Sequence, residues 1–419
     1  MRLMISLSAL LMSVMFVQMG IGSLRPFDTI SGQALGFTPT QIGLVASGHF
    51  AGFLIGCVCS PFLVKRVGHS RAFAAMAGVA VMSIIAHPLH PDPYFWAFVR
   101  VFSGFAVAGC YTLIESWLQA KVTNNIRGRV FGVYRLVDLS GQLLANGMIA
   151  MLTPASYVSY NIVALVMCLS IMPLTLTQSK EPALPEQVSF QPLYAFSVSP
   201  LATLGVLVAG ISTATFGSVG PLFASAVGLS LSQIALFLIM AILGGVCSQM
   251  PCGMLADRVS RRTVLFGLSV LATIISLVLT TDLAMQNAGL LPMAIVLSFL
   301  FGFSTFPIYS VCASHASDFV QPQDMLALSA SLIFCYATGA IVSPLIAGWL
   351  IEVFAPYAIF TFISVAHFLL MLFTIYRNFV RPVVRRSKPT AYVPRTSLFI
   401  ANILRGRRSK SQSQNASEY

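Results

Sequence analysis

Four ionisable side chains lie inside long apolar stretches in the first half of the chain: Arg100, Glu115, Arg135 and Asp138. A charge at such a position in a membrane costs at least about 2.5 kcal/mol, so it usually binds a ligand, an ion or another charge. Arg100 could bind an anionic group or control the proton affinity of a nearby acid, and Asp138 could carry a proton. We therefore predict that Arg100 and Asp138 belong to a pathway for a substrate and for protons.

The depth of each charge follows from the rise of an α-helix. At about 1.5 Å per residue, Arg100 falls about 9 Å inside one boundary of the stretch 94–118, and Glu115 falls near the other boundary. The stretch 130–152 runs back, which places Arg135 about 7 Å and Asp138 about 12 Å from that second boundary. Glu115 and Arg135 are thus predicted to pair, as a structural bridge or as part of a gate. The alternative for Asp138, three residues from Arg135, is that it only neutralises this arginine.

Neutral polar side chains and a histidine at membrane depth are the other candidates. We predict that the pathway also includes Gln18, His49, Tyr111, Gln142 and Asn146. Gln249 and Tyr336 have the same character in the second half, although any of these groups could instead form hydrogen bonds between helices. The histidines are isolated and lack metal-ligand spacing, and the sequence contains no phosphate-binding loop or zinc signature. We expect no cofactor, no metal and no enzymatic activity.

The composition indicates the environment of these stretches. Hydrophobic residues make up 57% and charged residues 9% of the 419 residues, whereas soluble domains carry about 25% charged residues. We predict an all-α polytopic membrane protein, because each apolar stretch is long enough to cross a hydrocarbon core of about 30 Å as a helix. The twelve predicted helices are 3–24, 40–63, 72–90, 94–118, 130–152, 155–176, 201–224, 231–255, 263–281, 290–313, 326–350 and 354–377.

One polar segment divides these helices into two sets of six. We predict an N-terminal six-helix bundle at 1–176, a cytoplasmic linker at 177–200 and a C-terminal six-helix bundle at 201–378. The remainder, 379–419, is predicted to be a basic, disordered cytoplasmic tail. A basic tail at a membrane fits anionic lipid headgroups, so the net charge of +12 does not indicate nucleic-acid binding.

The basic residues of the predicted loops are concentrated on one side. Cytoplasmic loops of membrane proteins are typically rich in Lys and Arg. We predict that both termini are cytoplasmic, because the loops on their side contain Lys65, Arg66, Arg71, Lys121, Arg127, Arg129, Lys180, Arg258, Arg261 and Arg262. The loops on the other side contain Arg25, beside Asp28, together with Asp92, Asp282 and Glu352.

The two halves of the chain resemble each other at a shift of about 195 residues. The segment 35–42, LGFTPTQI, aligns with 227–234, VGLSLSQI, and Gly22-Ser23 aligns with Gly217-Ser218. Further along the chain, Gly141 aligns with Gly339. Several weak matches in the same order and at nearly one offset indicate a duplicated six-helix unit.

The loops after the second helix of each half carry related motifs. The second half reads GMLADRVSRR from Gly253 to Arg262, and the first half reads PFLVKRVGHSR from Pro61 to Arg71. Both resemble the signature G-x-L-x-D-R-x-G-R-R of the major facilitator superfamily of secondary transporters. Ser260 stands in place of a glycine, and Lys65 stands in place of the acid. The helix at 94–118 fits a second family feature, since Arg100 is followed by small residues at 103–109.

The resemblance covers essentially the whole chain and implies the roles of several residues. It implies twelve helices in two pseudo-symmetric six-helix bundles, with loop charges that hold one side shut in one state and release it in the other. The residues assigned to this gate are Lys65, Arg66, Gly68, Arg71, Glu115, Arg135, Gly253, Asp257, Arg258, Arg261 and Arg262. The alternative is that the loop cations only set the orientation in the membrane.

The function implied by this resemblance is secondary active transport. We expect a monomeric, multi-pass protein of the bacterial inner membrane that moves a small-molecule substrate by alternating access, with protons as the coupling ion. The alternative is a transporter-like receptor or assembly factor without transport activity. The identity of the substrate and the direction of transport stay open from the sequence.

Overall fold

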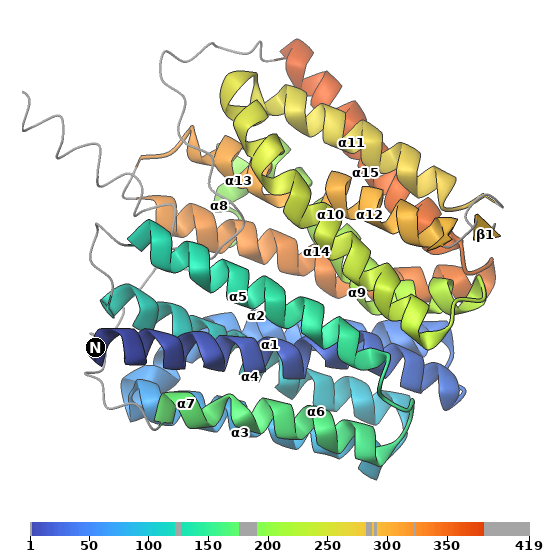
Figure 1. The fold of residues 1–419 in the computed structure, drawn as a ribbon. Helices are drawn as coiled ribbons and strands as arrows, with labels where there is room; N and C mark the ends of the chain where they lie inside the picture. The colour runs from blue at the N-terminus through green and yellow to red at the C-terminus, as the bar shows by residue number, and fades with distance from the viewer. Residues whose placement is uncertain are drawn as a thin grey trace, which may run out of the picture.

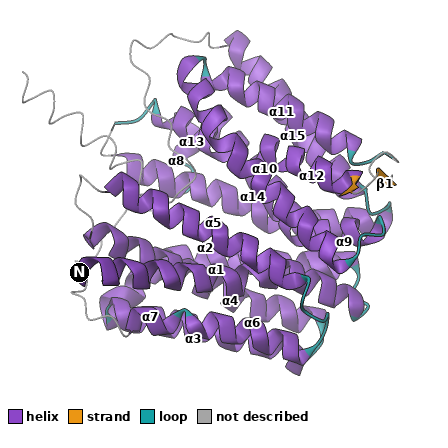
Figure 2. Ribbon diagram, in the orientation of Figure 1, coloured by secondary structure: helices purple, strands orange, loops and turns teal. Residues whose placement is uncertain are grey.

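The computed structural model describes residues 2–121, 127–175, 191–281, 287–288, 291–321 and 324–380. Apart from the turns and loops that connect them, these residues form helices and one pair of two-residue antiparallel strands, β1 (Asn287–Ala288) and β2 (Leu291–Pro292). Figure 2 shows this nearly uniform helical content. The prediction of an all-α membrane protein is confirmed. Most of the predicted linker and nearly all of the predicted tail, 381–419, lie outside the described residues.

The helices of the first half occupy the lower part of Figure 1. They are α1 (Arg2–Ala34), α2 (Pro39–Val67), α3 (His69–Leu89), α4 (Pro93–Lys121), α5 (Arg127–Ile149), α6 (Tyr157–Leu169) and α7 (Ile171–Thr175).

The helices of the second half occupy the upper part of the same view. They are α8 (Tyr194–Val198), α9 (Pro200–Ala226), α10 (Leu231–Arg258), α11 (Arg261–Val278), α12 (Met293–Thr305), α13 (Ile308–Ser317), α14 (Met325–Val353) and α15 (Ala358–Val380). The predicted helix 290–313 is therefore two helices, α12 and α13, which meet at Phe306-Pro307.

Among the described residues, eleven spans are long and apolar enough to cross a membrane, with α12 and α13 forming one of them. The remaining long helix, α5, corresponds to the predicted membrane helix 130–152. It carries Arg135, Asp138, Gln142 and Asn146, which all line an internal cavity described below. The polarity of α5 therefore follows from its position at that cavity.

The first helix is much longer than the sequence predicted. We expected it to end at residue 24, with Arg25 and Asp28 in an outer loop, but α1 continues to Ala34 and includes both residues. Pro26 does not end the helix, because proline already has a helical φ and the neighbouring helices can satisfy the freed carbonyl group. This correction brings two more charged side chains into the membrane-spanning part of the protein.

The duplication predicted from sequence has a structural counterpart at the starts of α2 and α10. Each helix begins with a capping box, formed by Thr38 and Gln41 in α2 and by Ser230 and Gln233 in α10. The turns before them contain Gly36 and Gly228, whose φ angles of +81° and +83° favour glycine. Aligned residues thus form the same glycine turn and helix cap in both halves.

The two halves meet mainly through α2 against α14, α5 against α10 and α1 against α9. The face at which α1 begins, together with the turns at 67–69 and 258–261, is called the N-terminal face here and lies at the left of Figure 1. The other end of the bundle, with the turns at 35–38 and 227–230 and with β1, is the opposite face.

Candidate functional site

A cavity of about 700 Å³ lies between the two halves of the protein. Its lining reaches Ser317 and Met325, which lie at the N-terminal-face ends of α13 and α14. Toward the opposite face the lining includes Pro26 of α1 and Gly217 of α9, eight and nine residues from the ends of their helices, and Asn146, three residues from the end of α5. The cavity therefore extends from the middle of the bundle to the N-terminal face.

Most of the intramembrane residues singled out from the sequence line this cavity. They are Gln18, His49, Tyr111, Glu115, Arg135, Asp138, Gln142 and Asn146 in the first half, with Gln249 and Tyr336 in the second. These side chains come from α1, α2, α4, α5, α10 and α14. The polar candidates thus share one surface, although they are scattered over more than 300 residues of sequence.

A polar chain of contacts runs along the first-half wall of the cavity. Arg135 forms an ion pair with Asp138 on the same helix. The hydroxyl of Tyr111 donates to the other oxygen of the Asp138 carboxyl over 3.1 Å and also contacts the amide oxygen of Gln18. Glu115 accepts a hydrogen bond of 3.1 Å from Tyr134. The ion pair of Arg135 is therefore with Asp138, the alternative raised from the sequence.

Arg100 lies behind the cavity wall and is only 1% exposed. Its Nε atom is 3.2 Å from Oδ2 of Asp28, and Nε2 of His87 is 3.3 Å from the same oxygen. Tyr160 donates to the other oxygen of Asp28 over 3.0 Å. Arg100 was placed in the pathway by the sequence reasoning, and the structure places it in this buried cluster of Asp28, His87, Arg100 and Tyr160, which we call the Asp28 cluster.

The Asp28 cluster and the cavity are joined by one serine. Ser103 donates to the carbonyl oxygen of Arg100 and accepts from its Nη1 at 3.5 Å. The same hydroxyl lies 3.2 Å from Nδ1 of His49, which lines the cavity. A change of charge in the cluster can therefore affect the cavity wall through the contacts of two side chains, Ser103 and His49.

The sequence reasoning missed Asp28, His87 and Arg25. Asp28 and Arg25 were assigned to a loop because α1 was ended ten residues too early. His87 stands near the end of α3 and has no charged neighbour in sequence, so no local pattern marks it. The signal that could have found Asp28 is the buried Arg100, which requires an anionic partner at its depth.

The opposite face is closed by direct contact between helix backbones. A Cβ atom on Gly43 of α2 would lie 2.2 Å from the carbonyl oxygen of Pro344 in α14. Likewise, a Cβ atom on Gly348 would lie 2.2 Å from the carbonyl oxygen of Pro39. Only glycine permits such an approach.

Hydrogen bonds between the halves accompany this closure. The side chain of Glu352 in α14 accepts a hydrogen bond of 3.2 Å from the backbone N–H of Thr40, in the first turn of α2. Thr29 of α1 donates to the carbonyl oxygen of Ser218 in α9. The backbones are therefore in contact, and hydrogen bonds join the two halves, on the side of the cavity away from the N-terminal face.

The two loop motifs differ in structure as they do in sequence. In the second half, Arg261 is buried and its guanidinium lies 2.7 Å from Asp318 and 3.8 Å from Asp257, and it also donates to the carbonyl oxygen of Ser314. Arg262 donates to the carbonyl oxygen of Arg377. These contacts join the turn after α10 to α13 and α15, while Gly253 is buried and Arg258 is exposed.

In the first half the corresponding cations face outward. Lys65, Arg66 and Arg71 are exposed, and Gly68 forms the turn between α2 and α3 with a φ angle of +82°. His69, which aligns with Arg261, is buried and lies with its ring centroid 5.8 Å from that of Trp117. Lys65 in place of an acid therefore coincides with a loop whose cations lie on the surface.

A model of the Major Facilitator Superfamily matches residues 7–202 and 202–409, nearly the whole chain in two parts. The chain belongs to the Major Facilitator Superfamily. Among similar curated proteins, the "Uncharacterized MFS-type transporter YcaD" of Escherichia fergusonii is 24% identical over 356 residues, 84% of this chain and 89% of the relative. The protein of the same name in Salmonella typhi is 22% identical over 355 residues, with the same coverage.

Solved structures of this superfamily have the same fold. The nucleoside transporter NupG superposes with a TM-score of 0.74 at 14% identity, over 90% of this chain and 99% of that one. An inward-facing, occupied bacterial homologue of the lysosomal transporter Spinster gives 0.69 at 16% identity, over 89% and 95%. The D-xylose-proton symporter gives 0.62 at 16% identity, over 93% and 98%. The protein is thus a multi-pass membrane transporter with the fold of bacterial inner-membrane carriers.

Proposed function

We propose that this protein is a proton-coupled secondary transporter that works by alternating access, with the cavity as its substrate pathway. The single observation that carries the proposal is the asymmetry of the cavity. Its lining runs to the N-terminal face, whereas the backbones of α2 and α14 touch on the opposite side. A carrier open to one side and sealed on the other has this arrangement. The conformation described here is then the state open to the N-terminal face.

The Asp28 cluster supports proton coupling through its hydrogen-bond requirements. Nδ1 of His87 lies 2.8 Å from the carbonyl oxygen of Ser83, which can only accept, so Nδ1 carries a hydrogen. A neutral His87 would then direct the lone pair of Nε2 at Oδ2 of Asp28, 3.3 Å away. Adding one proton between these two atoms removes the repulsion. We assign the transported proton to this pair, with Arg100 holding the carboxylate from the other side.

The relatives give the proposal its context. One structurally similar protein is described as a proton symporter, and another as inward-facing. The contacts of Arg261 with Asp257 and Asp318 tie the turn after α10 to α13, so we assign to them the gating role that the motif implies. In the present state they stabilise the second half internally.

We propose further that the N-terminal face is cytoplasmic. The exposed cations Lys65, Arg66, Arg71 and Arg258 lie at helix ends on this face, as expected from the distribution of basic residues in membrane proteins. A fusion of alkaline phosphatase after residue 380 is expected to be inactive, and a fluorescent protein at the same position is expected to fluoresce. An active phosphatase would reverse the orientation.

Transport itself is tested with the purified protein in proteoliposomes that contain a pH-sensitive dye. We expect at least one solute from a panel of small metabolites and inhibitors to change the internal pH when it is added outside, and to accumulate when a pH gradient is imposed. Protein-free liposomes are the control. If solutes bind but none crosses under any gradient, the protein is a receptor or assembly factor and the transport proposal is wrong.

A further inference from the structure

We infer that the inner end of the cavity binds a singly charged organic anion with a flat apolar body, and that Arg25 holds its anionic group. The inference rests on the proposed function, since it takes the cavity as the substrate pathway. It adds the chemical class of the substrate, which neither the family nor the relatives specify.

Arg25 stands where the cavity meets the Asp28 cluster. It lines the large cavity and also a small pocket behind it that Asp28 and Arg100 share. Its guanidinium carbon lies 5.8 Å from the centre of the Phe50 ring, and a Cβ atom on Gly217 would be 3.7 Å from its Nη1. The missing side chain at Gly217 leaves space beside the guanidinium on the side of the second half. A ligand group can therefore reach Arg25 between the two halves.

The charges around this end of the cavity leave a positive excess. Arg25 and Arg100 carry two positive charges, and Asp28 supplies one negative charge. A proton on the His87 and Asp28 pair would raise the excess further. Such an excess within the membrane-spanning part favours a bound anion, because the surrounding protein and lipid stabilise an uncompensated charge less well than bulk water does. One negative charge on the ligand balances the site when the cluster holds no extra proton.

The charges nearer the N-terminal face do not change this balance. Arg135 and Asp138 pair with each other and are neutral together. Glu115 lies 22 residues along α4 from Pro93, and Arg25 lies nine residues from the end of α1. At about 1.5 Å per residue the two differ in depth by roughly 20 Å. The cavity is thus positive at its inner end and negative toward its mouth, so a small monoanion is drawn to the inner end.

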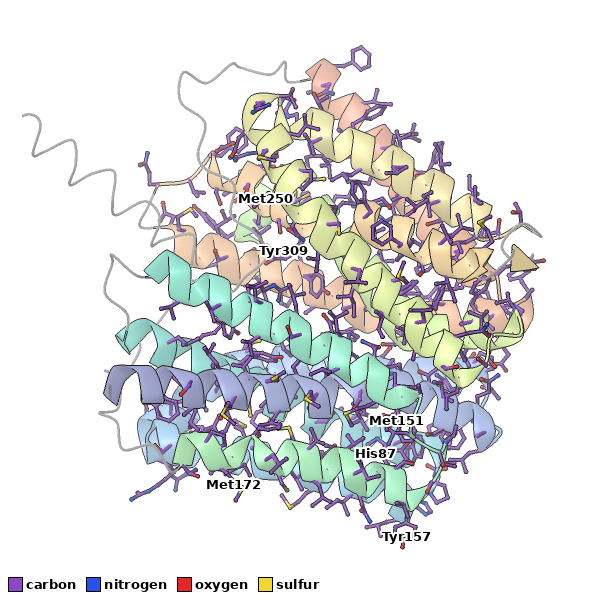
Figure 3. The ribbon with its side chains drawn as sticks, viewed as in Figure 1. His87, Met151, Tyr157, Met172, Met250 and Tyr309 are labelled. Carbon is purple, nitrogen blue, oxygen red and sulfur yellow. The ribbon has the colours of Figure 1, made fainter. Side chains whose placement is uncertain are left out.

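The wall that faces Arg25 is neutral and aromatic. Among the described residues of the second half, those that line the cavity include no Asp, Glu, Lys or Arg. Tyr336 is fixed there by a hydrogen bond of 2.6 Å with Thr213, and its ring centroid lies 5.7 Å from that of Tyr309, labelled in Figure 3. Tyr336 and Phe50 belong to one apolar contact cluster. A flat apolar group attached to the anion can pack against the exposed sides of these rings, which line the cavity.

A matched set of naphthalene compounds tests the inference by binding alone. We expect 1-naphthylacetate to raise the melting temperature of the purified protein in detergent, and the neutral 1-naphthylacetamide and the dianionic 1-naphthyl phosphate to bind at least about 30-fold more weakly. Arg25→Gln should weaken binding of the acid by at least about 30-fold and leave that of the amide unchanged, while Arg25→Lys should retain part of the difference. Arg377→Gln, which removes a cation far from the cavity, should bind like the wild type.

A second variant keeps the test decisive if Arg25→Gln does not fold. Gly217→Leu fills the space beside Arg25 without changing charge, and it should abolish binding of the acid. Equal binding of acid and amide, tighter binding of the phosphate, or no binding of the acid would overturn the inference. Binding of the acid that depends on Arg25, without flux in proteoliposomes, would overturn the transport proposal and leave this site in place.

Discussion

Transport driven by a pH gradient is expected to fall to background in Asp28→Asn. Asparagine keeps the size of the side chain but cannot exchange a proton with His87, from which it would be 3.3 Å away in the present geometry. Exchange of labelled substrate across the membrane without a gradient requires only the cavity, so we expect that exchange to continue. The measurement is the ratio of gradient-driven accumulation to exchange in the same proteoliposomes. This ratio should fall to the background level in Asp28→Asn.

The substitution also has a cost in stability that must be separated from the loss of coupling. Removing one partner of a buried ion pair typically costs about 3–5 kcal/mol, because the remaining charge loses its counterion. Arg100 is in that position when Asp28 is neutral. His87→Gln removes the proton-binding partner and leaves the ion pair of Arg100, so it should lose coupling with a smaller fall in melting temperature. Asp324→Asn, an acid outside the cavity and the cluster, is the matched control.

Normal gradient-driven accumulation in both Asp28→Asn and His87→Gln would exclude the Asp28 cluster as the proton site. Asp138, the acid that the sequence favoured, would then be the candidate proton site. That residue forms an ion pair with Arg135 and accepts a hydrogen bond from Tyr111 in the present state. Its position on the cavity surface suits contact with a substrate as well as with a proton.

Much of the fold could be predicted because the physical constraints on membrane helices are strong. The length of the hydrocarbon core determines the length of the apolar stretches. Twelve stretches were predicted on this basis, and among the described residues eleven spans are long and apolar enough to cross a membrane. The duplication was visible in short motifs such as the one around Gly36 and its counterpart around Gly228, since both are turns with positive φ. Local structure of this kind is encoded by neighbouring residues.

The main errors arose where a partner far away in sequence decides the structure. Hydropathy placed Arg25 and Asp28 outside the membrane, because two charges and Pro26 within four residues resemble a loop. In the structure Asp28 is stabilised by side chains from α3 and α4, which a local pattern cannot reveal. Arg100 was recognised as unusual, and its cluster with His87 and Tyr160 was not.

The cavity residues were easier to find than their contacts. Tyr111, Gln142 and Asn146 were singled out as polar groups at membrane depth, and they do line the cavity. Depth alone suggested that Arg135 would meet Glu115, but Asp138 lies one turn away on the same helix. The ion-pair partner of Arg135 was therefore predicted better by the three-residue spacing on its own helix than by similar depth on a neighbouring helix.

Gly43→Ala is expected to shift the conformational equilibrium away from the state described here. The new Cβ atom would lie 2.2 Å from the carbonyl oxygen of Pro344, so α2 and α14 must separate before the opposite face can close. Overpacking typically costs about 1–3 kcal/mol, which changes an equilibrium between two states by about 5- to 150-fold. We expect turnover to fall by a similar factor, because each transport cycle must pass through the closed contact.

The shift is measured by cross-linking Thr40→Cys to Glu352→Cys, which replace two residues that are in contact across the halves. In a background without the native cysteines, a short cross-linker should join them efficiently when Gly43 is present and poorly in Gly43→Ala. Gly147→Ala, where a Cβ atom meets nothing within 4 Å, should cross-link like the parent protein. Equal cross-linking and turnover in Gly43→Ala and Gly147→Ala would show that closure does not depend on this contact.

Gly52→Ala separates a change of conformation from a general loss of stability. Its Cβ atom would lie 1.8 Å from the carbonyl oxygen of Val101, but α2 and α4 belong to the same half of the protein. Helices within one half stay together while the halves move, so this clash is present in both states. Gly52→Ala should therefore lower the melting temperature without favouring either state, whereas Gly43→Ala should change cross-linking with a smaller effect on melting. The opposite pattern would mean that α2 moves against α4 during transport and that the two halves are not rigid units.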